Sequence, residues 1–146
     1  MQTDIQERCD RIEASYEFML SFAAQGLLTD EGSQSGKQLR EQIARMVDAL
    51  SGVEASCADL LKQGKLTPAD RYQSFFEVLA RDAKSALAAI ELVQAQPAIS
   101  SQLIDNLNAS VHVRALLADL FLITEILELH EKQAQYSLQA DLNVHS

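Results

Sequence analysis

Four long segments of this chain repeat apolar residues at the spacing of an α-helix, and each of the first three ends at residues that stop helices. The clearest pattern lies in residues 37–63, where apolar side chains recur at alternating steps of four and three. This spacing places them in one stripe along a helix. Gly26, Gly64 and Pro97 end the first three segments, because glycine and proline terminate helices. We therefore predict helices over residues 4–25, 37–63, 68–95 and 101–132.

Two of these helices also carry start signals. Thr3 precedes the first helix and Gln6 follows three positions later, which is the pattern of a capping box. Pro68 stands at the first position of the third helix, where the absence of an amide proton leaves no hydrogen bond unmade. These signals set the beginnings of the first and third helices.

The length of the chain and its few helix breakers favour one all-helical domain. With 146 residues the chain can bury a complete core without disulfides or metals. The short links at Gly64 and Pro97 require neighbouring helices to run in opposite directions. We predict an all-α, antiparallel, up-down-up-down four-helix bundle over residues 1–132. Residues 133–146 lose the apolar period, so we expect a frayed or partner-dependent tail.

The charge of the chain argues against several kinds of partner. Twenty-one acids and 12 bases give a formal net charge of −9, and a surface of this sign repels the phosphates of nucleic acids. The beginning of the sequence lacks the basic and apolar regions of a signal peptide. The most apolar region, residues 111–129, contains four charged residues, so it reads as a buried helix and not a membrane span. We expect a cytoplasmic protein that binds neither nucleic acid nor membrane.

Metal, cofactor and catalytic motifs are missing from the sequence. A di-metal bundle needs Glu-x-x-His pairs on facing helices, and the chain has none. Cys9 and Cys57 both fall on predicted core stripes. They could lie near one end of the bundle and form a disulfide, but disulfides are rare in the cytosol, which favours two buried thiols. We predict no metal, no cofactor and no enzymatic activity.

One group of polar residues could form a site. Asp105, Asn108 and His112 share one side of the helix predicted over residues 101–132. An imidazole beside an amide and a carboxylate can shuttle a proton, hold a ligand or carry phosphate, as in phosphotransfer domains. Those domains have Lys and Gly three and four positions after the active histidine, where this chain has Ala115 and Leu116. The same residues could simply be the hydrated edge of the helix, so a phosphotransfer or small-ligand module is the alternative prediction.

The chain has more apolar residues than one core can bury. Phe18 and Phe22 lie four residues apart and away from the main stripe of the first helix, and Leu92 leaves the core face of the third. The last predicted helix is apolar nearly all round, with Leu122 and Ile126 among its outer residues, and such a helix must be covered on every side. We predict that these five residues contact another protein or a second copy of the chain. The predicted function is therefore a non-enzymatic interaction protein, a regulator, adaptor or small chaperone, that forms a homodimer or binds a helical segment in a hydrophobic groove.

Overall fold

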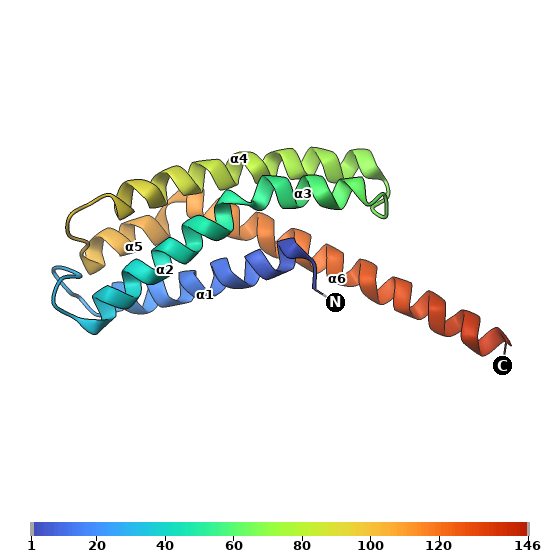
Figure 1. Ribbon diagram of the computed structural model, residues 1–146, viewed down its shortest axis with the longest axis horizontal. Coiled ribbons are helices and arrows are strands. Elements are labelled where there is room, and N and C mark those ends of the chain that lie inside the picture. The colour runs from blue at the N-terminus through green and yellow to red at the C-terminus, as the bar shows by residue number, and fades with distance from the viewer. Residues whose placement is uncertain (1, 146) are drawn as a thin grey trace.

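The computed structural model describes residues 2–145 and shows helices packed along one another, with the last helix extending beyond the rest (Figure 1). Within this range all regular secondary structure is helical, without a strand. The prediction of a single all-α domain is confirmed. The six helices are α1 (Asp4–Ala24), α2 (Gln34–Ser51), α3 (Val53–Lys62), α4 (Ala69–Gln94), α5 (Ser101–Ala109) and α6 (Val111–His145).

One hydrophobic core lies between these helices. Helix α1 packs against α2 and α5, while α4 packs against α6, α2 and α3. The stripe predicted in residues 37–63 faces this core, and all seven of its apolar positions are buried: Leu39, Ile43, Met46, Leu50, Val53, Cys57 and Leu60. The alternating spacing of four and three therefore identified the buried side of this segment correctly.

The capping box predicted at the start of α1 is present. The Gln6 amide donates to the Thr3 hydroxyl at 3.3 Å, and the Thr3 amide donates to the Gln6 side chain at 2.8 Å. At the far end of α1, Gly26 adopts a φ of +66°, a backbone conformation that glycine adopts without steric penalty. Both ends of α1 thus follow from local sequence chemistry.

The segment predicted as one helix over residues 37–63 is two helices, α2 and α3, separated at Gly52. A side chain at this position would overlap the Arg8 guanidinium. That guanidinium donates to the carbonyl oxygens of Asp48 and Ala49 at 3.4 and 3.1 Å. The interruption leaves carbonyls near the end of α2 without helical partners, and the side chain of Arg8 satisfies them.

The segment predicted as one helix over residues 101–132 is also two helices, and it ends later than predicted. Ser110 has an extended backbone (φ −56°, ψ 135°) between α5 and α6, and its hydroxyl accepts a hydrogen bond from the His112 amide at 3.2 Å. Serine at this position caps the new helix. Helix α6 then continues to His145, through the residues expected to form a frayed tail. We call residues 131–145 the arm and the remaining packed helices the body.

Arg40 joins two connections at the end of the body opposite to the arm. Its Nε atom donates to Asp30 Oδ2 at 2.8 Å, and its Nη atoms donate to the carbonyl oxygens of Gln94 and Gln96 at 2.9 and 3.0 Å. Asp30 also accepts from the Ile99 amide at 2.6 Å. Burial alone would raise the pKa of Asp30, but the hydrogen bonds from Arg40 and Ile99 outweigh burial and lower the pKa below its ordinary value.

Ser101 and Gly36 hold the same end together. The Ser101 hydroxyl donates to the Phe22 carbonyl oxygen at 2.6 Å and accepts from the Leu27 amide at 2.9 Å, which fixes the start of α5 against the end of α1. A side chain at Gly36 would overlap the backbone of Asp30. The connection between α1 and α2 therefore lies directly on the first turn of α2.

The structure also answers the question of membrane spans. Within the part of the chain that it describes, no helix combines the length and the apolar character that crossing a membrane requires.

We expect Asp30→Ala to lower the free energy of unfolding by about 2 to 4 kcal/mol. The substitution leaves the Arg40 guanidinium without its carboxylate and the buried Ile99 amide without an acceptor. Urea denaturation followed by circular dichroism measures the change. Glu41→Ala, on an exposed position of α2, is the control and should change the stability by less than about 0.5 kcal/mol. Equal effects of the two substitutions would contradict the role of Asp30.

Candidate partner-binding surfaces of helix α6

The two phenylalanines predicted to contact a partner belong to the core or pack against it. Phe22 is 0% exposed, and Phe18 is partly buried against the core residues. The prediction of Phe22 as a partner contact is wrong. The physical reason is that α2, α5, α3 and α6 all pack on α1, so the buried side of α1 is wider than a single stripe.

The other predicted contacts lie at or near the surface. Leu92 on α4 is 67% exposed and Leu122 on α6 is 53% exposed, while Ile126 is half-buried. Leu122 and Ile126 share one side of α6. They therefore remain candidates for a partner-binding surface.

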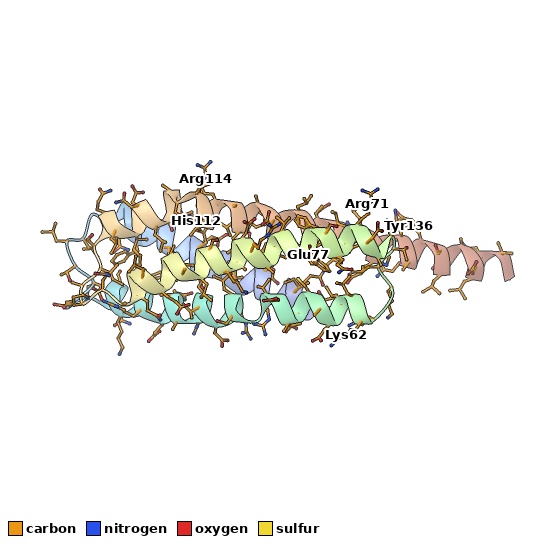
Figure 2. All side chains as sticks on the ribbon, turned by 90° about the horizontal axis from the view of Figure 1, so that it is seen from above. Lys62, Arg71, Glu77, His112, Arg114 and Tyr136 are labelled. Carbon is orange, nitrogen blue, oxygen red and sulfur yellow. The ribbon has the colours of Figure 1, made fainter. Side chains whose placement is uncertain are left out.

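The structure does not bring Asp105, Asn108 and His112 together on one surface. Asp105 and His112 are exposed, whereas Asn108 is buried. The interruption at Ser110 also places His112 on a different helix from the other two. Figure 2 shows His112 and Arg114 near the beginning of α6, far from Tyr136 on the arm. Asp105 and His112 are thus separate surface residues and Asn108 is a core residue, so the three do not form one site.

A regular stripe of positions runs along the side of α6 that faces away from the core. At 100° per residue, these positions lie opposite the buried Leu116, Leu120 and Leu127. We call this the outer stripe. Leu129 and Tyr136 on it are 48% and 77% exposed. Its members follow steps of four and three: Leu122, Ile126, Leu129, Gln133, Tyr136, Ala140 and Asn143.

The arm carries a second apolar face on its other side. Ala134, Leu138 and Leu142 continue the line of the buried α6 residues beyond the end of the body, and we call them the inner face of the arm. Leu138 and Leu142 are each 65% exposed. A helix with apolar residues on two opposite sides leaves both sides in water when it stands alone, so the arm is suited to contact other protein surfaces.

A cleft of about 400 Å³ lies where the arm leaves the body. Its apolar lining comes from Leu60, Leu66 and Leu127, which are themselves largely buried. Polar groups complete its walls, including the acids Asp4, Asp59 and Glu131 and the bases Lys65 and His130. The inner face of the arm continues from this cleft, so the two form one elongated surface with an apolar floor and a mainly acidic rim.

A pair of carboxyl groups that the sequence analysis missed lies between α4 and α6. Burial, together with the neighbouring Asp82 carboxyl, raises the pKa of Asp119 to about 7. Asp119 lies one helical turn before Leu122, the first residue of the outer stripe. The carboxyl pair therefore lies beside the end of the stripe that is nearest the body. The available signal was the presence of an acid beside the apolar stripe of each helix, but the sequence does not say that the two acids face each other.

The two cysteines lie in the core. Cys9 and Cys57 are buried and free, and burial raises their pKa values to about 11 and about 12. Both thiols therefore stay protonated near neutral pH and are poor nucleophiles. Among residues 2–145, no group of three or more His, Cys, Asp or Glu side chains is arranged to hold a metal ion.

Comparison with known proteins adds no relative to this description. The chain matches no protein-family profile, no curated protein and no solved structure.

We expect Phe22→Ala to lower the free energy of unfolding by about 3 to 5 kcal/mol, because it opens a cavity at a fully buried position. Leu122→Ala, on the outer stripe, should cost less than about 1 kcal/mol. Urea denaturation of the two variants makes the comparison. A small loss for Phe22→Ala would contradict its place in the core.

We expect Asp119→Asn to stabilise the protein more at pH 8 than at pH 5. The pKa of Asp119 lies near 7 in the folded protein and near 3.8 in the unfolded chain, so the folded state holds this proton more tightly. The contribution of Asp119 to the free energy of unfolding therefore falls as the pH rises from about 4 to about 7. Because Asp119 is partly exposed, solvent screening limits the gain of the variant at pH 8 to about 1 kcal/mol.

Chemical denaturation of the wild type and the Asn variant at both pH values tests this expectation. Asp105→Asn, which removes an exposed carboxyl from α5, is the control and, as a surface substitution, should change the stability by less than about 0.5 kcal/mol. An equal difference at both pH values for Asp119→Asn would show that the pKa of Asp119 is not raised in the folded protein.

Proposed function

We propose that this protein is a non-enzymatic interaction protein, a regulator, adaptor or small chaperone, that binds an α-helical segment of a partner. The observation that carries the proposal is the course of α6, which leaves the body as a helix with apolar side chains on both sides. Leu138 and Leu142 on the inner face of the arm are each 65% exposed. An apolar helical face of this kind is typical of helix-in-groove recognition.

The shape and charge of the cleft favour a particular kind of segment. A partner helix with an apolar stripe would lie on Leu60, Leu66 and Leu127 in the cleft and continue along the inner face of the arm. Three acids against one lysine line the cleft, and the chain as a whole has a net charge of −9. We therefore propose an amphipathic helix with basic flanks, because opposite charges favour association and discourage wrong partners.

The proposal includes three finer expectations. The fold is an antiparallel up-down-up-down four-helix bundle, in which α2 with α3 forms one of the four helices and α5 with α6 forms another. The protein acts in the cytoplasm, and it forms homodimers.

Phosphotransfer through His112 receives no support from an observation, because Asn108 is buried on α5 while His112 is exposed on α6.

We expect the double substitution Leu138→Ser and Leu142→Ser to abolish capture of the native partner from a cell lysate. Serine removes the apolar contacts while the arm stays exposed and helical in the free protein. The tagged full-length chain serves as bait, and quantitative mass spectrometry compares the captured proteins. Circular dichroism confirms that the helical content of the variant is unchanged.

Leu28→Ser is the matched control. Leu28 is 93% exposed in the connection between α1 and α2, at the end of the body opposite to the arm (Figure 1). The partner should bind this variant as it binds the wild type. A protein captured equally by all three baits would contradict binding at the inner face of the arm.

A further inference from the structure

The outer stripe has a more regular period than packing on the body requires. Its seven positions, from Leu122 to Asn143, follow alternating steps of four and three, which is the 3.5-residue period of a coiled coil. At 1.5 Å per residue they span about 30 Å. Only the side of α6 that faces the body packs on other helices of the chain, so the outer stripe has no helix of its own to pair with.

We propose that the outer stripe pairs with the outer stripe of a second copy of this chain, so that two α6 helices form an antiparallel coiled coil. The inference rests on the proposed role of α6 as the interacting helix, but it uses the face opposite to the proposed partner cleft. A second copy supplies a straight helix of equal length with the same period, which is what a coiled-coil stripe requires of its partner.

The charge distribution favours a second copy at this place and an antiparallel orientation. The arm contains only two of the 21 acids and one of the 12 bases, so nearly all of the net charge lies on the body. The part of the contact that lies on the arm therefore carries little charge. An antiparallel pair also points the two acidic bodies in opposite directions, which reduces their mutual repulsion.

The polar residues of the stripe fit a two-fold axis at Gln133. With the axis there, the two Gln133 amides face each other and can exchange hydrogen bonds. Ile126 then lies opposite Ala140 of the second copy, so that a larger side chain meets a smaller one, and Leu129 lies within one residue of facing Tyr136. A single buried polar pair of this type fixes the register of a coiled coil. The acids Asp82 and Asp119 mark where the apolar pairing stops.

The size of the contact suits a weak dimer. Leu122, Leu129 and Tyr136 are between 48% and 77% exposed, and together with Ile126 and Ala140 they offer roughly 500 Å² per copy. The pair would bury about 1,000 Å², which is near the threshold for a biological interface and in the range of weak, transient ones.

Sedimentation velocity of the full chain at micromolar concentration tests the proposal. We expect a dimer for the wild type. The double substitution Leu129→Ser and Tyr136→Ser should raise the dimer dissociation constant by at least about tenfold, because both removed side chains lie at the centre of the contact. The variant with serine at Leu138 and Leu142 should still form the dimer, since those leucines lie on the other side of the arm.

Cysteine crosslinking gives a second readout that does not depend on destabilising the helix. Gln133→Cys should form a disulfide-linked dimer under mild oxidation, because the two-fold axis brings the two thiols together. Gln135→Cys is the matched control, since it lies two residues away on the opposite side of the same exposed arm. The native Cys9 and Cys57 are buried and contribute to neither crosslink.

Three results would overturn the inference. A wild-type monomer throughout the micromolar range would do so and leave the proposed partner cleft untouched. A dimer that persists after substitution of Leu129 and Tyr136 would place the contact elsewhere. Equal crosslinking at positions 133 and 135 would show that the arms do not pair along the outer stripe.

Discussion

The contact on which the rest of the structure depends is the cluster of hydrogen bonds around Arg40. Its guanidinium reaches Asp30 in one connection and the carbonyl oxygens of Gln94 and Gln96 in another. Both connections are therefore fixed to the first half of α2. Since Asp30 also accepts from the Ile99 amide, the same cluster sets the position from which α5 begins. The direction of α5, and through it of α6, follows from this end of the body.

Helix α6 is longer than the helix α4 that packs against it. Helix α6 begins beside the other helices at Val111 and has 35 residues, or about 52 Å at the rise of an α-helix. Helix α4, which packs against it, has 26 residues. The last part of α6 cannot be covered by helices that end earlier. The two apolar faces of the arm are thus a property of helix lengths and not of local sequence alone.

The sequence predicted the helical class and the buried side of most helices because these depend on local periodicity. Leu39, Ile43 and Met46 show this most simply. Phe22 could not be placed from sequence, because its burial depends on how many helices surround α1. The interruptions at Gly52 and Ser110 were missed for a related reason: the apolar period continues across both, and the contacts that stabilise them come from Arg8 and from the Ser110 hydroxyl itself.

Only one part of the candidate surfaces could be predicted from the sequence. Leu122 and Ile126 were predicted as contacts because the last predicted helix is apolar on more sides than one core can cover, and that argument needs only the sequence. The extension of the surface along the arm was not predicted. Residues 133–146 alternate apolar and polar side chains without one dominant face, a pattern that sequence reasoning interprets as loss of helix. Two opposite apolar faces on one helix produce the same pattern.

The attachment of the arm to the body changes the energetics of recognition. An isolated helix of about 15 residues is marginal in water, because the first turn is costly to form while each further residue adds to an existing helix at little cost. The body holds the first turns of α6 in place through Leu116, Leu120 and Leu127. The arm therefore extends a helix that already exists and needs no nucleation of its own. A partner or a second copy that binds the arm loses less free energy to ordering than it would with a disordered tail of the same composition.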